Sequence, residues 1–300
     1  MSINCTLPEV KKDPVSSSQT KQRTLQRKVS LAGEGLFTGE KAVLSIGPAE
    51  ADTGILFQRT DLPRKPFLPA ILEYVQGTPR CTMIGCQGAL IQTVEHLLSA
   101  LKGCQIDNAL IEIHGPEIPI LDGSAKEFVE LIEQAGIAEQ TEERVFGKLE
   151  RPVFWSQGDT HIVALPSNEY RISYTLHYPH SAFIGSQYLS IVCNEANFKN
   201  EIAPCRTFSL YEEIVPLIEK GFLKGGNLSN AVLIRDNAVA NPEGLRFKDE
   251  MVRHKILDLI GDLSLIGTPF LAHIIAIRSG HTSNVAFAKE LAKHITMENV

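Results

Sequence analysis

MVRHKILDLIGDL, residues 251–263, combines the apolar spacing of a packed helix with several ionisable side chains. Its Val, Ile and Leu residues recur as in a helix that is buried in a core. His254, Asp258 and Asp262 follow at successive i, i+4 steps, so all three side chains lie along one face of that helix. An imidazole and two carboxylates on one stripe of so apolar a helix need a chemical explanation.

The same pattern occurs once more, earlier in the chain. TVEHLLSALKG (93–103) aligns with MVRHKILDLIG (251–261), so that His96 corresponds to His254 at an offset of about 158 residues. Two further matches keep the same order: TLQRKVSLAGEG (24–35) with KLERPVFWSQGD (148–159), and Gly123 with Gly280. Amphipathic helices share apolar spacing by chance, but three matches in order favour an internal duplication. We therefore predict an α+β fold of two similar domains, with helices packed against β-sheets.

Polarity and the offsets of the repeat set the expected domain limits. Residues 1–23 are polar and have too little apolar surface to fold, so we expect a disordered N-terminal tail. A first α+β domain is expected over 24–145 and a second over 146–300, with the polar segment AEQTEERVFG at the boundary. The offset grows from about 124 to about 158 residues along the chain. This growth implies an insert in the second domain, near 209–245.

Apolar periodicity locates the main elements. Alternating apolar residues predict strands at 41–48 and 171–178. Helical spacing predicts helices at 93–101, 124–136, 249–266 and 281–295. Asp122 or Ser124 is expected to cap the second of these helices, and Gly136 to end it.

Composition narrows the class of protein. The formal net charge is −6 and no long basic run occurs, so nucleic acid is not an expected partner. No segment approaches the roughly 18 uncharged apolar residues of a spanning helix, and the N-terminus lacks the apolar region of a signal peptide. The six Cys residues show no CxxC spacing. We therefore expect a cytoplasmic protein with reduced thiols and without stable membrane insertion.

The repeat indicates a metal site where the two domains meet. If the two His-bearing helices meet there, His96, His254 and Asp258 converge, and two imidazole nitrogens with one carboxylate oxygen can bind Zn²⁺. Three protein ligands leave a fourth position open for water, as in catalytic zinc sites. Neighbours on a helix point about 100° apart, so Glu95 suits a general base better than a ligand. The alternative is that each His is an ordinary core residue.

Five motifs in this order resemble one enzyme family: TVEHLLSAL, PILDGSAKEF, APCRTF, GLRFKDEMVRHKILDLIGDL and SGHTSN. The chain resembles the UDP-3-O-acyl-N-acetylglucosamine deacetylases, the zinc enzymes of the committed step of lipid A synthesis in Gram-negative bacteria. The likeness covers nearly everything except the N-terminal tail. It implies two α+β domains, each with helices sandwiched against sheets, that face each other across the active site.

The resemblance implies catalytic roles for particular residues. The zinc ligands would be His96, His254 and Asp258, and Glu95 would be the general base. His281, in SGHTSN, would protonate the departing amine. Asp262 would hold His281 and favour its imidazolium form. Thr207, in CRTF, would donate its hydroxyl to the oxyanion.

The resemblance also implies how the substrate is bound. Lys255 and Arg278 would face the diphosphate or the developing charge, and Phe208 would line the sugar pocket. Leu210 stands where an aromatic residue often follows in relatives, which leaves nucleotide stacking at this substrate-binding position uncertain. Asp122, in LDGS, matches a family motif, although an Asp-Gly turn that caps a helix explains it as well. A cysteine near the zinc of some relatives aligns with Cys81.

The implied reaction is hydrolysis of the N-acetyl group of UDP-3-O-acyl-N-acetylglucosamine, which yields acetate and the free amine. One Zn²⁺ per chain is expected, and Fe²⁺ suits the same ligands. No obligatory protein partner is evident. Two alternatives stay open: a zinc amidohydrolase for another N-acetylated sugar, and a sugar-nucleotide-binding protein with a structural metal.

The insert is the expected site for the acyl chain of the substrate. Its apolar residues on a predicted helix are Leu210, Ile214, Val215, Leu217, Ile218, Phe222 and Leu223. In the family this region forms a hydrophobic passage, and the alternative is that these residues only close the domain's own core. Three further departures from the family bear on affinity: Phe37 replaces a frequent His, Arg80 a frequent apolar residue, and Thr160 a frequent basic residue.

Overall fold

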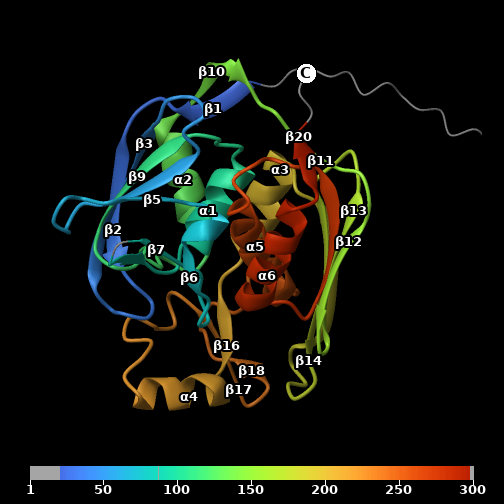
Figure 1. The fold of residues 1–300 in the computed structure, drawn as a ribbon. Coiled ribbons are helices and arrows are strands. Elements are labelled where there is room, and N and C mark those ends of the chain that lie inside the picture. Colours follow the sequence, from blue (N-terminus) through green and yellow to red (C-terminus); the bar gives the residue numbers. More distant parts are fainter. Residues whose placement is uncertain (1–20, 87, 298–300) are drawn as a thin grey trace, which may run out of the picture.

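The computed structural model describes residues 21–86 and 88–297. Two β-sheets form the outer layers of the molecule, and helices fill the space between them (Figure 1). The first half of the chain supplies one sheet and the second half the other. The core is therefore one continuous apolar layer between the two sheets.

The two sheets have the same strand order and the same strand directions. The first sheet runs β2 (Val29–Glu34), β3 (Lys41–Pro48), β9 (Ala109–His114), β4 (Ile55–Arg59) and β5 (Phe67–Pro69). The second runs β12 (Val153–Gln157), β13 (Thr160–Pro166), β19 (Ala272–Ile277), β14 (Arg171–Tyr178) and β15 (Gly185–Val192). In each sheet the third and fourth strands are parallel and the other pairs are antiparallel. The predicted strands at 41–48 and 171–178 are confirmed.

Four helices lie between the sheets, two from each half of the chain. They are α1 (Glu95–Gly103), α2 (Lys126–Ala135), α5 (Glu250–Ser264) and α6 (His281–Ala292). The central strands β9 and β19 show the same alternation of buried and part-exposed residues, because one face of each packs on these helices. All four predicted helices are confirmed, although the last ends at Ala292 and not at the predicted residue 295. None of the described helices combines the length and the apolar character that crossing a bilayer requires.

In each half of the chain, the first and the last strand are short and pair with each other. β1 (Lys21–Leu25) pairs antiparallel with β10 (Ile137–Glu143), and β11 (Gly147–Leu149) pairs antiparallel with β20 (Ile295–Met297). The expectation of a disordered tail up to residue 23 is wrong for residues 21–23, because they pair with a strand more than 110 residues away. The rest of that expected tail lies outside the described residues. β10 pairs with the start of the first half of the chain, and β11 pairs with the end of the second half. We therefore propose the domain boundary between β10 and β11.

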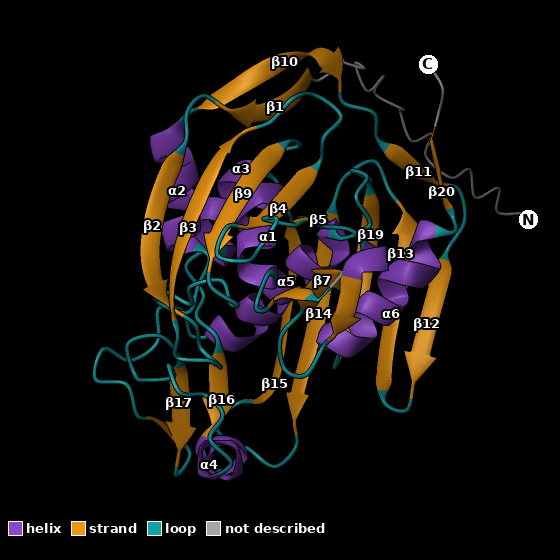
Figure 2. Ribbon diagram, turned by 60° about the vertical axis from the view of Figure 1, so that its left-hand side comes forward, coloured by secondary structure: helices purple, strands orange, loops and turns teal. Residues whose placement is uncertain are grey.

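The segments between these matching elements differ most. The first half carries a small sheet of β6 (Val75–Gly77), β7 (Met83–Cys86) and β8 (Ala89–Ile91), preceded by η1 (Leu72–Tyr74). The second half carries α3 (Glu195–Asn197), η2 (Phe198–Ile202) and the small sheet of β16 (Phe208–Leu210), β17 (Val232–Arg235) and β18 (Ala238–Val239), with α4 (Tyr211–Glu219). The predicted insert near 209–245 corresponds to α4, β17 and β18, which project from the end of the sandwich (Figures 1 and 2).

Close packing at a glycine sets how α1 and α5 cross. A Cβ added at Gly261 would lie 2.1 Å from the backbone oxygen of Glu95. A Cβ added at the repeat partner, Gly103, would lie equally close to the ring of Phe198. Absence of a side chain at Gly261 therefore lets the two helices meet at the residues that carry their ionisable groups.

The predicted cap of α2 is wrong in detail. Ala125 occupies the N-cap position, and no side chain caps it. Asp122 Oδ1 accepts hydrogen bonds from the amide and the hydroxyl of Ser124, and Ser124 Oγ accepts one from the amide of Lys126. These bonds form a turn before the helix, where Asp122 also pairs with Arg246 at 2.7 Å. Gly136 ends the helix at φ +75°, as predicted.

Candidate active site

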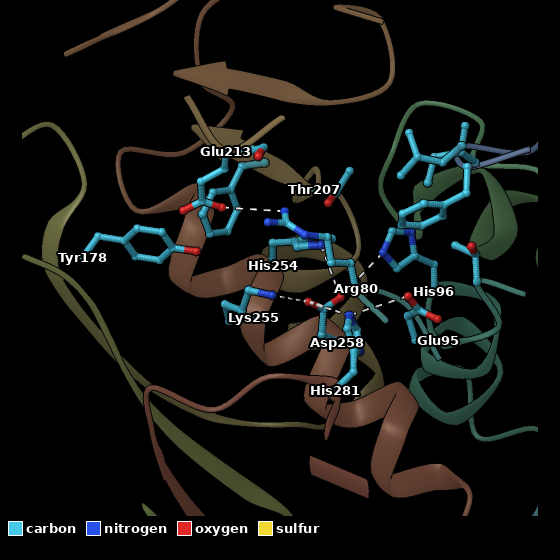
Figure 3. A pocket seen from close by; sticks show the side chains of 16 residues that line it. Arg80, Glu95, His96, Tyr178, Thr207, Glu213, His254, Lys255, Asp258 and His281 are labelled. Carbon is cyan, nitrogen blue, oxygen red and sulfur yellow. Dashed lines mark hydrogen bonds and ion pairs between the residues drawn. The ribbon is translucent and has the colours of Figure 1, made fainter. Parts of the chain in front are cut away.

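The crossing of α1 and α5 brings together the three predicted metal ligands. His96, His254 and Asp258 are almost fully buried, and one potential ligand atom from each lies within 4.8 Å of the others. Asp258 Oδ1 lies 3.2 Å from His254 Nε2 and 3.6 Å from His96 Nε2. Figure 3 shows the three side chains pointing toward one another from the two helices. The expected meeting of the two His helices is thus confirmed geometrically.

The state of these groups fits a divalent cation. Asp258 Oδ1 is buried and has no hydrogen-bond partner among the described residues. His254 Nδ1 lies 3.0 Å from the backbone oxygen of Cys205, which fixes a tautomer that leaves the lone pair on Nε2. Burial lowers the pKa of His96, so its imidazole is neutral and able to coordinate. Two imidazole nitrogens and an unpaired carboxylate oxygen are a suitable ligand set for zinc.

Lys255 compensates the charge of Asp258 from the opposite side. Its Nζ donates to Asp258 Oδ2 at 2.7 Å, which leaves Oδ1 for the ligand position. Burial alone would raise the pKa of Asp258, but His254 and Lys255 hold it well below its usual range. The pKa of Lys255 is raised, because the nearby Asp258 outweighs its burial. Both groups are therefore charged at neutral pH.

Glu95 lies at the first turn of α1, beside the ligand group. Its Oε2 accepts a hydrogen bond from the amide of Thr82 at 3.0 Å, and its Oε1 lies 3.7 Å from His281 Nε2. Burial raises the pKa of Glu95 to about 7, His281 opposes this shift, and the nearby Asp262 and Asp258 add to it. A carboxylate that titrates near neutral pH is suited to accept and release a proton.

His281 begins α6 and is held by Asp262 of α5. His281 Nδ1 lies 2.9 Å from Asp262 Oδ2, which also accepts a hydrogen bond from Asn284. Burial would lower the pKa of His281, but Asp262, Glu95 and Asp258 raise it to about 10. His281 is therefore an imidazolium at neutral pH, with Nε2 directed toward the ligand group (Figure 3).

Thr207 and Phe208 reach the site on a segment that is docked on α5. Arg206 is fully buried, and its Nε donates to Glu250, the first residue of α5, at 2.8 Å. The amide of Thr207 donates to the backbone oxygen of Gly123 at 2.8 Å. Gly123 has φ +83° and no room for a Cβ, so the PILDGS motif positions Thr207. The ring of Phe208 lies 5.8 Å from Lys255 Nζ.

Two adjoining cavities open at these residues. The first has a volume of about 150 Å³ and is lined by the metal-ligand group, Glu95, His281, Lys255 and Thr207. The second has a volume of about 300 Å³ and is lined mainly by apolar residues of the insert, among them Ile214, Ile218 and Leu223. Both cavities share the lining residues Leu36, Phe37, Arg80, Thr207, Phe208 and Ser209. The insert thus places an apolar cavity directly beside the polar one.

Some predicted residues do not line either cavity. Leu210 packs against the core, and Arg278 is exposed beside Asp159, with 3.3 Å between Arg278 Nη1 and a carboxylate oxygen. The predicted passage residues Val215, Leu217 and Phe222 are likewise absent from the lining of the apolar cavity. Cys81 is buried and lies outside the ligand group of the described residues, and burial raises the pKa of its thiol.

Two other residues at the site, Glu117 and Arg80, were not predicted to act there. Glu117 is fully buried and accepts hydrogen bonds from Phe37, Thr38 and Thr93, which fixes the loop that lines both cavities. Arg80 reaches the cavities from a left-handed backbone position and lies 3.7 Å from Glu213 of α4 (Figure 3). These contacts join segments far apart in the chain, so spacing alone does not reveal them.

A family model described as UDP-3-O-acyl N-acetylglycosamine deacetylase (LpxC) matches residues 22–293 of the chain. The chain belongs to this deacetylase family. Curated relatives named UDP-3-O-acyl-N-acetylglucosamine deacetylase include the proteins of Chlamydia pneumoniae and Chlamydia muridarum, each 50% identical over 277 residues. The matches cover 92% of this chain and 98% and 96% of those relatives. The protein of Chlamydia felis with the same name is 48% identical over 274 residues, 91% of this chain and 98% of its own.

Membership of the deacetylase family agrees with the chemistry of the cavity. A hydrolase that acts on an amide bond needs an activated water and a proton donor for the amine. The site combines a candidate metal-ligand group with Glu95, a carboxylate whose pKa is about 7, and with the imidazolium of His281. The family resemblance that the sequence motifs carried is confirmed.

Proposed function

We propose that His96, His254 and Asp258 hold one zinc ion, around which this deacetylase hydrolyses the N-acetyl group of UDP-3-O-acyl-N-acetylglucosamine. The deacetylase activity, a step of lipid A biosynthesis, follows from the family to which the chain belongs. The observation that carries the zinc assignment is the buried, unpartnered Oδ1 of Asp258 between two imidazole Nε2 atoms. Fe²⁺ suits the same ligands.

A bound zinc ion supplies Lewis acidity, which polarises the acetyl carbonyl and makes water a better nucleophile at neutral pH. Glu95 accepts the proton of the attacking water with Oε1, because Oε2 is already held by the amide of Thr82. Its pKa of about 7 lets it take this proton and later release it.

His281 supplies the proton that the leaving nitrogen requires. Its Nδ1–H bond to Asp262 keeps Nε2 as the donor toward the cavity. An amide anion is a very poor leaving group, so the carbon–nitrogen bond breaks only when the amine is protonated. Acetate and UDP-3-O-acyl-glucosamine are the products.

Thr207 and Lys255 are placed to stabilise negative charge on the carbonyl oxygen. Both line the cavity beside the ligand group. The hydroxyl of Thr207 donates a hydrogen bond, and the ammonium of Lys255 adds positive charge in a buried setting, where charge is weakly screened. Asp262 acts through His281 and does not touch the substrate.

The apolar cavity beside the site takes the 3-O-acyl chain. Its lining by Ile214, Ile218 and Leu223 suits a hydrocarbon chain that leaves the sugar near Phe208. This cavity favours the acylated sugar over another N-acetylated sugar. Phe208 contacts the sugar ring, and Leu210, two residues further along β16, packs against the core.

The diphosphate of the substrate requires cations at the entrance. Arg80 lines both cavities and is half-exposed, so we assign it to the diphosphate together with Arg278. Arg278 is exposed and its side chain is paired only with an exposed Asp159 among the described residues, so it is available to an anion. A UDP-linked sugar is a metabolite of the cytoplasm, where we place the enzyme.

The proposal is tested by hydrolysis of two substrates that differ only at the sugar 3-position. We expect the purified, zinc-loaded protein to release acetate from the 3-O-acyl compound and to act far more slowly on UDP-N-acetylglucosamine with a free 3-hydroxyl. Equal turnover of the two would refute the role of the apolar cavity. No acetate from either, with zinc bound, would refute the hydrolytic function.

A further inference from the structure

We propose that Thr82 is a positioning residue of the deacetylation, which holds the proton acceptor of one half of the chain and the proton donor of the other in a fixed relation. This inference rests on the roles proposed above for Glu95 and His281. Thr82 lies on the segment between β6 and β7 and is fully buried. It is not part of the ligand group and does not itself line either cavity.

The backbone of Thr82 fixes the start of α1. Its amide donates to Glu95 Oε2 at 3.0 Å, and its carbonyl accepts from the amide of Val94 at 3.3 Å. One oxygen of Glu95 is thereby occupied, and the other, Oε1, is left 3.7 Å from His281 Nε2. The orientation of the proposed base therefore depends on the position of Thr82.

The side chain of Thr82 reaches into the other half of the molecule. Its Oγ1 lies 2.5 Å from Asp262 Oδ1 and 3.4 Å from His281 Nδ1. An ionised carboxylate only accepts hydrogen bonds, so the hydroxyl must donate to Asp262. Among the described residues, Asp262 has two other side-chain donors, His281 and Asn284, and both belong to α6. Thr82 is thus its link to the first half of the chain.

This pair of bonds matters because proton transfer depends on distance and angle. Glu95 comes from α1 and the dyad of Asp262 and His281 from α5 and α6. A shift of about 1 Å in such a group lowers turnover by as much as two orders of magnitude. Thr82 holds both groups, because its hydroxyl donates a hydrogen bond to Asp262 and its amide donates one to Glu95.

A purely structural role makes a different prediction. A buried Asp262 that loses a donor becomes less well solvated, which destabilises the protein whatever its chemistry. Such a loss lowers the melting temperature but leaves kcat per folded, zinc-loaded molecule unchanged. The two roles therefore separate when kcat, KM, zinc content and stability are measured on the same samples.

The experiment compares four variants of the full chain loaded with zinc. Thr82→Val removes the hydroxyl at nearly constant shape, and Thr82→Ser restores it. Thr82→Cys matches serine in size but is a weak donor, and it serves if the valine variant does not fold. Thr78→Val is the control, because the exposed hydroxyls of Thr78 and Thr282, 2.8 Å apart, also join the segment before β7 to α6, and neither residue lines a cavity.

We expect Thr82→Val and Thr82→Cys to lower kcat by about 10- to 100-fold, with KM and one bound zinc per chain retained. Thr82→Ser should stay close to wild type, and Thr78→Val should equal it. Wild-type kcat in the valine or cysteine variant would overturn the proposal. So would a serine variant as impaired as the cysteine variant.

A second readout does not depend on activity. The Nδ1–H proton of His281, which is hydrogen-bonded to Asp262, gives a proton NMR signal in metal-free protein. Loss of the Thr82 hydroxyl should shift that signal, whereas Thr78→Val should not. An unmoved signal in Thr82→Val or Thr82→Cys would overturn the proposal. If wild type itself lacks deacetylase activity, the proposed function fails, and the NMR result still decides whether Thr82 positions His281.

Discussion

Alanine at Gly261 should damage the site more than the stability of the fold. The new Cβ would lie 2.1 Å from Glu95 O and 3.0 Å from Glu95 Cα. Both are backbone atoms, which cannot rotate away. Ordinary carbon contacts need about 3.5 Å, so α1 and α5 must separate by roughly 1 Å. That separation acts directly on Glu95 and His96 on one helix and on His254 and Asp258 on the other.

The magnitudes follow from this displacement. Overpacking costs about 1–3 kcal/mol of unfolding free energy, and the better helix propensity of alanine offsets about 1 kcal/mol. The net loss of stability is therefore about 1 kcal/mol, whereas a shift of about 1 Å in the catalytic groups lowers kcat by about 100-fold. Zinc affinity should fall as well, because the ligands come from both helices.

The assay is thermal unfolding, zinc affinity and kcat on the same preparation. Gly103→Ala is the matched control: its Cβ would meet the ring of Phe198, which is a side chain at the far end of α1. We expect comparable destabilisation there with nearly normal kcat. A Gly261→Ala protein with wild-type zinc affinity and turnover would refute the reasoning about the helix crossing.

Three further outcomes are expected. The pH profile of kcat/KM should be bell-shaped, because activity rises as Glu95 loses its proton near pH 7 and falls as His281 loses its proton near pH 10. An unchanged alkaline limb in His281→Gln would contradict this assignment. Glu95→Ala should lose orders of magnitude in turnover while zinc content stays at one per chain, and loss of the metal would make Glu95 a ligand instead. Leu223→Asp should weaken long-chain substrates far more than short-chain ones, because Leu223 lines the apolar cavity, and equal losses would count against that cavity as the acyl site.

The metal-ligand group could be predicted because its sequence pattern lies within one helix and recurs in a second helix. His254 and Asp258 lie one helical turn apart, and the repeat assigns His96 to the same helical position. The matching strand orders of the two sheets agree with that repeat. The four helices and the strands β3 and β14 follow from apolar periodicity, which reports the burial of one face, and the insert follows from the growth of the repeat offset.

What sequence reasoning missed depends on contacts between distant segments. Residues 21–23 are polar, and nothing local indicates that they pair with β10. Thr82 and Glu117 act through hydrogen bonds that exist only once the two halves have packed. The sequence marks Arg80 only as a departure from relatives. Its place in the lining of both cavities depends on its left-handed backbone conformation and on the neighbouring α4.

The most direct test is a zinc titration of metal-stripped protein, with bound metal and deacetylase activity measured at each step. Activity should rise in proportion to bound zinc and reach its maximum at one ion per chain. His96→Ala and His254→Ala should each weaken binding of that same ion, since it lies between α1 and α5. Full activity in the stripped protein, or undiminished zinc binding in both variants, would contradict a metal site shared by the two helices.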